Sequence, residues 1–215
     1  MIVARAQTPR GELALRRDGA HFEIISNGVF LMDTRGGRSE RLLATAALDV
    51  HPAPRRVLVG GLGVGFTLGA VLADPRVAAV TVVEVEPVIV GWQHATLAAF
   101  SGRALDDPRV DVVVADLADY LASSDASYDV ICLDVDNGPD WTVTEGNDWL
   151  YTPAGTSLLL ERLRPASVLA VWSSREVPEY EDALRARFAH VAVHLTPRDG
   201  RCPDVVYVAG SRPAC

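Results

Sequence analysis

The chain has 215 residues, 49% of them hydrophobic, so it can bury a sizeable core and is not a disordered chain. Its 20 basic residues are outnumbered by 28 acidic ones, and the formal net charge of −8 argues against a nucleic-acid-binding surface, which needs clustered basic side chains. All the basic residues are arginine, so mechanisms that need a lysine, such as Schiff-base formation, are excluded.

The cysteines, the histidines and the apolar segments exclude further classes of protein. The three cysteines share no metal-ligand spacing, and the five histidines pair neither with one another nor with a cysteine. We therefore expect no metal site and no disulfide framework. The first residues contain no signal-peptide core, and no stretch approaches the ~20 apolar residues of a membrane span. These absences predict a cytoplasmic protein without membrane contact.

The first part of the chain predicts a small antiparallel β element. Short strands are expected over residues 12–17, 21–26 and 29–33. They are separated by Asp18-Gly19 and Asn27-Gly28, which supply the positive φ of tight hairpin turns. Residues 38–50 have apolar side chains at helical spacing, and two prolines follow. We predict an N-terminal β element and helix over residues 1–54 and a main domain over residues 55–215.

In the main domain, apolar runs alternate with segments of helical periodicity. The predicted strands cover residues 57–59, 80–83, 111–114, 128–133 and 168–172, and the predicted helices between them cover residues 66–72, 88–100, 117–122 and 153–163. Such strands pair in parallel, because parallel strands need crossover connections. A last helix over 179–188 precedes a hairpin of strands 191–195 and 204–209. The fold class is therefore α/β: a Rossmann-like, doubly wound, mostly parallel sheet with an antiparallel C-terminal edge, plus the N-terminal antiparallel β element.

A glycine-rich loop follows the first strand of the main domain. Its glycines, Gly60, Gly61, Gly63 and Gly65, allow sharp turns and close approach of a ligand to the backbone. A tight strand-to-helix turn would use the same residues. Glu84 ends the next strand, where an acid accepts hydrogen bonds from a ribose. The dinucleotide pattern G-x-G-x-x-G would need a glycine at Phe66, so NAD fits less well than a nucleotide without a pyrophosphate.

Three more acids occupy informative places. Asp116 follows the third strand of the main domain, where it can accept from an adenine amino group or cap the next helix, or do both. Glu86 precedes a proline and is expected to favour the N-terminus of its helix. Asp134 ends the fourth strand, facing the place where the glycine loop would hold its ligand. Asp134 is the catalytic candidate.

The segment after Asp134 is acidic and aromatic. It contains five acids between residues 134 and 148, which can bind a cationic amine and take its proton. The acceptor-binding candidates are Asp136, Asn137, Trp141 and Tyr151, the aromatic ones through cation–π contact. The alternatives are a solvated loop whose aspartates cap turns, and aromatic side chains that fill the core beneath it.

In their order along the chain, these segments resemble the spermidine synthase (polyamine aminopropyltransferase) family within the S-adenosylmethionine-dependent methyltransferase superfamily. The resemblance runs from about residue 22 to residue 209 and includes the segments 24–33, 57–65, 82–86, 107–110, 115–116, 128–134, 163–165 and 168–173. Residues 134–139 with 147–151 are similar to a bacterial spermidine synthase-like subgroup.

The resemblance implies roles for the acids named above. Glu84 would hold the ribose and Asp116 the adenine amino group, and Asp134 would be the general base on the amine side. The donor would be S-adenosylmethionine or decarboxylated S-adenosylmethionine. An N-terminal β element often supports dimers in this family, so the resemblance also implies a homodimer.

The sequence departs from the family's pattern at three places. Val64 stands where the glycine loop of the family carries an acid that contacts the donor's amino group. The acceptor-site triplet Tyr-His/Gln-Glu aligns with Ser39-Glu40-Arg41. The second acid of Asp-x-x-Asp-Pro falls on Asn137, one residue after Asp136. The C-terminal part is also shorter than in the synthases.

The function expected from these observations is a transferase that alkylates a small acceptor, with a cationic amine as the candidate, by aminopropyl or methyl transfer. Attack on a carbon next to a sulfonium depends mainly on alignment of the nucleophile with the leaving group, while Asp134 removes a proton. Two alternatives remain. One is a non-catalytic S-adenosyl-nucleotide-binding regulatory protein, and the other is an NAD-dependent reductase.

Overall fold

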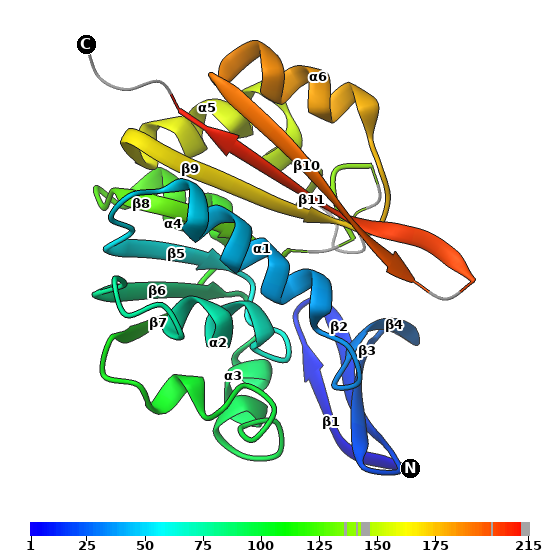
Figure 1. Cartoon of the computed structure of the whole chain (residues 1–215). Coiled ribbons are helices and arrows are strands. Elements are labelled where there is room, and N and C mark those ends of the chain that lie inside the picture. Colours follow the sequence, from blue (N-terminus) through cyan, green and yellow to red (C-terminus); the bar gives the residue numbers. More distant parts are fainter. Residues whose placement is uncertain (136, 141, 143–146, 199, 212–215) are drawn as a thin grey trace.

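The computed structural model describes residues 1–135, 137–140, 142, 147–198 and 200–211, and it contains two β-sheets with helices packed around the larger one (Figure 1). The smaller sheet has the strand order β1-β2-β3-β4 and the larger one the order β10-β11-β9-β8-β5-β6-β7. No helix in this described part of the chain is long and apolar enough to cross a bilayer.

The small sheet is an antiparallel meander at the N-terminus. Its strands are β1 (Ile2–Thr8), β2 (Gly11–Asp18), β3 (His21–Ser26) and β4 (Val29–Asp33). The two predicted turns are confirmed, since Gly19, Asn27 and Gly28 all have positive φ. The sequence did not predict β1, because none of its side chains is fully buried and no clear apolar alternation results.

The large sheet confirms the predicted fold class. Its strands are β5 (Arg56–Gly60), β6 (Ala79–Glu84), β7 (Val110–Val114), β8 (Tyr128–Leu133), β9 (Leu163–Ser173), β10 (His190–Arg198) and β11 (Arg201–Gly210). The five strands β5 to β9 pair in parallel, and β11 pairs antiparallel with both β9 and β10. The C-terminal hairpin therefore forms the antiparallel edge.

Six α-helices and two short 3-10 helices connect the strands of the described chain. The α-helices are α1 (Arg38–Val50), α2 (Phe66–Leu72), α3 (Pro87–His94), α4 (Leu117–Ser123), α5 (Pro153–Arg162) and α6 (Pro178–Arg187), and the 3-10 helices are Ala104–Asp106 and Asn147–Tyr151. The predicted helix over 88–100 was wrong in its second half. The carbonyl of Trp92 accepts from both Ala95 N and Leu97 N, at 3.1 and 2.8 Å, which ends the α-helical bonding; turns follow and bury Leu97.

The core consists of two layers, one on each face of the large sheet. Val57 and Val59 of β5 face one layer, which α1, α2 and α3 cover, whereas Leu58 faces the other layer, beneath α4, α5 and α6. Cys132 of β8 is fully buried in the first layer. Because both faces are covered, residues 57–59 of β5 and 130–133 of β8 are continuous apolar runs, as expected for buried parallel strands.

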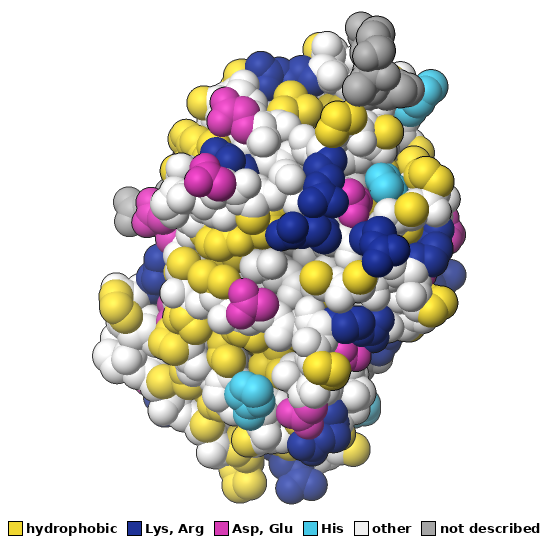
Figure 2. Space-filling model, turned by 90° about the vertical axis from the view of Figure 1, so that its left-hand side faces the viewer, with side chains coloured by type: hydrophobic (Ala, Val, Ile, Leu, Met, Phe, Trp, Pro, Cys, Tyr) yellow, Lys and Arg dark blue, Asp and Glu magenta, His cyan; other side chains and the backbone are white. Residues whose placement is uncertain are grey.

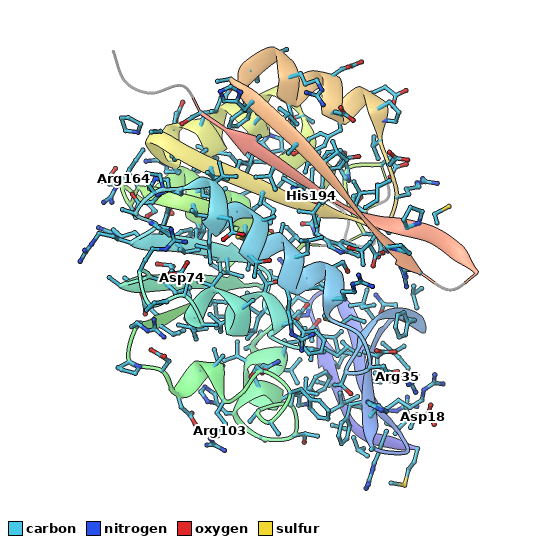
Figure 3. All side chains as sticks on the ribbon, in the orientation of Figure 1. Asp18, Arg35, Asp74, Arg103, Arg164 and His194 are labelled. Atoms are coloured by element: carbon cyan, nitrogen blue, oxygen red, sulfur yellow. The ribbon has the colours of Figure 1, made fainter. Side chains whose placement is uncertain are left out.

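The amino ends of the parallel strands carry structural ion pairs. Arg164, at the edge of the molecule far from the small sheet in Figure 3, places Nη1 3.0 Å from Asp129 Oδ1. The other oxygen of Asp129 accepts from the backbone N–H groups of Arg55 and Arg56. Figure 2 shows this side, where arginine side chains lie among acidic and apolar ones. The carboxyl ends of the strands lie toward the small sheet, and the chemistry-bearing residues gather there.

Candidate active site

A cavity of about 860 Å³ lies between the carboxyl ends of the parallel strands and the small sheet. Its walls come from the glycine loop, the ends of β6, β7 and β8, the N-terminus of α1, the C-terminal hairpin, and the β1–β2 turn with β4 of the small sheet. Ligands of open α/β sheets bind at this edge. The cavity is thus the candidate active site.

The glycine loop forms the floor of the cavity. Gly61 and Gly63 line it, with φ of 84° and 47°. A Cβ on Gly61 would lie 2.3 Å from the backbone oxygen of Asp134, so only glycine fits there. Gly60 and Gly65 shape the loop from behind: a Cβ on Gly60 would meet the Leu117 side chain at 2.7 Å, and Gly65 begins α2 with a φ of 83°.

Glu84 supports the glycine loop and faces the cavity. Its Oε2 accepts from Leu62 N and its Oε1 from Glu86 N, both at 2.9 Å. Burial raises the pKa of the Glu84 carboxyl, and the backbone hydrogen bonds oppose this shift. Glu84 accepts from the backbone N–H groups of Glu86, Leu62 and Gly63, and because a carboxylate offers about four acceptor positions, it can hold the loop and still accept from a ligand.

Asp116 caps α4 and lines the cavity. Its Oδ1 accepts from Ala118 N at 2.9 Å and from Asp119 N at 3.4 Å, which confirms the capping role. Its Oδ2 lies 3.7 Å from Nη2 of Arg10, in the β1–β2 turn. The same carboxyl remains placed for a ligand at the end of β7.

Asp134 follows β8 directly and lies next to the glycine loop. Its backbone N–H donates to Gly60 O at 2.8 Å, and its Oδ2 accepts from Thr67 Oγ1 at 2.6 Å. Burial and then the charge of Glu40 raise the pKa of Asp134 to about 7, although the Thr67 hydrogen bond lowers it. A carboxyl with this pKa can take a proton near neutral pH.

Two acids to which the sequence assigned no role in the site lie close enough to Asp134 for their charges to raise its pKa. Glu40 lies in the first turn of α1, and Asp204, which is 7% exposed, lies on β11. Ser39 Oγ connects them, at 2.9 Å from Glu40 Oε2 and 2.9 Å from Asp204 Oδ2. Arg198 binds the other oxygen of Asp204 at 2.8 Å. No local motif marks this group, because α1 and the C-terminal hairpin meet only in the folded chain.

Two positions where the sequence departs from the family pattern lie outside the cavity lining. Arg41 stacks its guanidinium 4.2 Å from the ring centre of Phe66 and donates to Gly36 O. Val64 is fully buried in the core layer under α1. The carboxyl that α1 presents to the cavity is therefore that of Glu40, one residue before the aligned position.

Two of the four predicted acceptor residues lie in the described part of the chain, one in the cavity wall and one in the core. Asn137 lines the cavity, and its carbonyl accepts from Ser174 N and Oγ at 3.0 and 2.9 Å. Tyr151 lies in the second core layer, where its hydroxyl donates to Val135 O at 2.9 Å and its ring packs edge-on against Tyr180. Asp136 and Trp141 lie outside the described residues. Within the described chain, no group of three or more His, Cys, Asp or Glu side chains is arranged to hold a metal.

Comparison with known proteins identifies the family. The family model for the spermine/spermidine synthase domain matches residues 38–189. Polyamine aminopropyltransferase 2 of Pseudomonas aeruginosa is 36% identical over 134 residues, which cover 60% of this chain and 36% of that protein. Polyamine aminopropyltransferase of Leptospira interrogans is 27% identical over 176 residues, or 80% of this chain and 34% of that protein. The matched segments thus span about a third of the length of these relatives.

Solved structures share the fold. A spermidine synthase in complex with the transition-state analogue AdoDATO superposes with a TM-score of 0.82 at 21% identity, over 99% of this chain and 74% of that one. Human methyltransferase-like protein 13 in complex with SAH gives a TM-score of 0.56 at 20% identity, over 82% of this chain and 79% of that one. Because the family model matches residues 38–189, which are most of this chain, the chain belongs to the spermine/spermidine synthase family.

Proposed function

We propose that the protein transfers an aminopropyl group from decarboxylated S-adenosylmethionine to a small cationic amine. The observation that carries this proposal is the position of Asp134: a carboxyl with a pKa of about 7 stands between the glycine loop and the acids Glu40 and Asp204, in one cavity. The curated relatives are named polyamine aminopropyltransferases, which supports the same reaction class.

The donor would lie along the glycine loop. Gly61 and Gly63 allow its chain to approach the backbone, Glu84 accepts from the ribose, and Asp116 accepts from the adenine amino group. These roles follow from the strand ends on which the residues lie. A decarboxylated donor fits the cavity better than S-adenosylmethionine itself, because a surplus of carboxylates favours a ligand without one.

The acceptor side favours a cation. Glu40, Asp134 and Asp204 face one another, and each carries or can carry a negative charge. Arg198 compensates Asp204, but within the described chain Glu40 has no basic side chain paired with it. Like charges held together in a partly buried space are stabilised by a cationic ligand. An ammonium group supplies that charge.

The proposed reaction is a single displacement. The nitrogen of the acceptor amine attacks the aminopropyl carbon bound to the sulfonium, the new N–C bond forms, and the C–S bond breaks with its electron pair on sulfur. The products are the aminopropylated amine and neutral methylthioadenosine. Asp134 takes the proton that the nitrogen loses. The protein's main contribution is alignment of the two substrates in the cavity.

Calorimetric titration tests the donor site. We expect binding of decarboxylated S-adenosylmethionine and of methylthioadenosine, with weaker binding of S-adenosylmethionine. If none of the three binds, the proposal is wrong. Tight binding of NADH in their place would favour the reductase.

Turnover tests the reaction. Release of methylthioadenosine with a diamine acceptor is expected, and Asp134→Asn should lower the rate by about 10²–10⁴ while donor binding is retained. Asp125→Asn, on an exposed loop, is the matched control. Transfer of a methyl group from S-adenosylmethionine would show that the protein is a methyltransferase and not an aminopropyltransferase. Binding without turnover over a range of amines, unchanged in Asp134→Asn, would favour the non-catalytic alternative.

A further inference from the structure

Thr67 is a buried hydroxyl next to Asp134 to which the proposed reaction assigns no role. It is the second residue of α2, is 2% exposed and does not line the cavity. Its Oγ1 lies 2.6 Å from Asp134 Oδ2 and 3.3 Å from the backbone oxygen of Glu40. One hydroxyl therefore connects three elements of the site: α2, the end of β8 and the first turn of α1.

A hydroxyl has a single proton, and the two distances show which oxygen receives it. The contact of 2.6 Å has the length of a hydrogen bond from a hydroxyl to an ionised carboxylate, whereas 3.3 Å is long for any bond between two oxygens. Thr67 therefore donates to Asp134 while that carboxyl is ionised. Among the described residues, no other group donates to the Asp134 carboxyl and no arginine pairs with it.

The hydrogen bond determines which oxygen of Asp134 can act on a substrate. Oδ2 is bound to Thr67, whereas Oδ1 has no partner among the described residues and belongs to a side chain that lines the cavity. Rotation about the last bond of an aspartate is broad and roughly two-fold, so an unbound carboxylate would exchange its two oxygens freely. A threonine is stiff at χ1, which keeps the donating hydroxyl in one place. The bond thus holds the carboxylate in one orientation.

Titratable groups on several elements surround the carboxyl of Asp134. They are Glu40 on α1, Glu84 on β6, Cys132 on β8 and Asp204 on β11. Burial raises the pKa of Asp134 most, and the charges of the three acids raise it further. The hydrogen bond from Thr67 acts in the opposite direction and lowers this pKa. It therefore helps to keep the carboxyl able to accept a proton near neutral pH.

We propose that Thr67 is a positioning residue for the general base: its hydroxyl binds Oδ2 of Asp134 and leaves Oδ1 free to take the proton. The assignment rests on the proposed function, in which the attacking nitrogen loses a proton to Asp134. The N–H bond breaks, the new O–H bond forms at Oδ1, and Thr67 donates to Oδ2 throughout. After exchange of that proton to Oδ2, the carboxyl donates to Thr67, whose own proton turns to the carbonyl oxygen of Glu40. The hydroxyl thus has a partner in both protonation states.

An NMR pH titration of carboxyl-labelled aspartates tests the hydrogen bond without turnover, with the Asp134 signal assigned by its loss in Asp134→Asn. Thr67→Val keeps the shape of the side chain and removes the hydroxyl, so the pKa of Asp134 should rise from about 7 by about one pH unit. Thr67→Ser should restore the wild-type titration. An unchanged pKa in Thr67→Val, with an active wild type, overturns this inference and leaves the proposed function intact.

Steady-state kinetics with a diamine acceptor test the positioning role. In Thr67→Val the half-maximal rate should move to higher pH, and kcat at pH 7 should fall roughly tenfold while KM for the donor is unchanged. Thr67→Ser should recover most of the rate. A lower rate with an unmoved pH profile would show that Thr67 has only a structural role. If the wild type releases no methylthioadenosine with any amine, the proposed function fails, and this inference fails with it.

The matched control is Thr156→Val. Thr156 is 4% exposed on α5, and its hydroxyl donates to Thr152 O within the same segment of chain. Its loss should leave the Asp134 titration and the pH profile unchanged, and equal shifts in the two valine variants would contradict the assignment. Thermal unfolding shows whether each variant is folded, and Thr67→Ala, which also lacks the hydroxyl, replaces Thr67→Val if that variant does not fold.

Discussion

Glu40 and Arg41 are neighbours on α1, but the side chain of Glu40 lines the cavity and that of Arg41 does not. Glu40 faces Asp134, whereas Arg41 lies over Phe66 on the outside of α1. An alignment compares position 41 with the family's acid and finds an arginine. Successive helical side chains point in directions about 100° apart, so the carboxyl at position 40 occupies a different part of the cavity wall.

The charge of Glu40 predicts a change in the pH dependence of turnover. Like charges raise the pKa of a carboxyl, so Glu40→Gln should lower the pKa of Asp134 from its value of about 7. The rate of the proposed reaction rises with pH as Asp134 loses its proton, and the half-maximal rate should therefore move to lower pH in the variant. Rates of methylthioadenosine release across pH 5–9 measure this shift. An unchanged profile, equal to that of Asp125→Asn, would show that Glu40 does not act on Asp134.

Sequence reasoning found the acids that follow parallel strands and missed those that depend on tertiary contact. Glu84, Asp116 and Asp134 each come at the carboxyl end of an apolar run, so their common edge follows from the strand pattern. Glu40 and Asp204 are 164 positions apart, and only the packing of α1 against β11 brings them to Ser39. The acceptor role of Tyr151 stays a prediction, and its place in the core matches the alternative that the sequence left open.

Among the elements, the glycine loop has the tightest steric requirement. Gly61 combines a positive φ with a backbone oxygen in the place of its missing Cβ, whereas Gly19, in the β2–β3 turn, has a φ of 61° and open space around it. Gly61→Ala should therefore destabilise the protein by about 2–4 kcal/mol and abolish donor binding. Gly19→Ala should cost only the backbone strain, about 1 kcal/mol, with donor binding intact. Urea unfolding and calorimetric titration separate the two, and equal losses would contradict the steric argument.

Element boundaries were predictable where caps or prolines mark them. α1 spans the predicted residues 38–50, and α5 and α6 each begin at the proline after a cap position. The end of α3 carries no proline or glycine signal, because backbone bonding to Trp92 O ends that helix. Division of the chain after residue 54 remains a prediction, and α1, on its N-terminal side, packs on the large sheet against β9 and β11.

At the scale of the whole molecule, the strand order of the large sheet was not part of the prediction. The parallel pairing followed from the alternation of strands and helices. The position of the small sheet did not, because its strands carry no signal that says which part of the large sheet they contact. Hydrogen bonds such as Thr8 to Glu86, between residues 78 positions apart, define that position. Homodimer formation, predicted from the family resemblance, is open to sedimentation measurements.

Stability at low pH should depend on Asp107, before β7. Hydrogen bonds from the Arg109 side chain and then from its backbone lower the pKa of Asp107 from 3.8 to about 2. A carboxyl whose pKa is lower in the folded than in the unfolded state stabilises the protein when the pH is above the unfolded-state pKa. This stabilisation is lost as the pH falls through the folded-state pKa. Asp107→Asn should cost about 1 kcal/mol at pH 7 and remove this part of the pH dependence between pH 4 and pH 2.

The control for Asp107 is Asp106→Asn. Asp106 pairs with Arg103, an exposed side chain at the surface of the molecule (Figure 3), whereas Arg109 also donates to Val77 O and Leu72 O. Asp106→Asn should leave the unfolding free energy nearly unchanged. Urea unfolding at several pH values compares the two variants. Equal effects would show that the Asp107–Arg109 pair contributes no more to the free energy of unfolding than the exposed Asp106–Arg103 pair.

The cavity between the two sheets has a consequence for the molecule as a whole. A ligand that touches the β1–β2 turn and β4 on one side and the glycine loop on the other would join the small sheet to the large one, which the backbone connects only through residues 34–55. Occupancy then acts as a non-covalent cross-link between the sheets. Ligand binding and docking of the small sheet are thermodynamically linked. The free energy that the small sheet contributes to ligand binding therefore stabilises that sheet against detachment by the same amount.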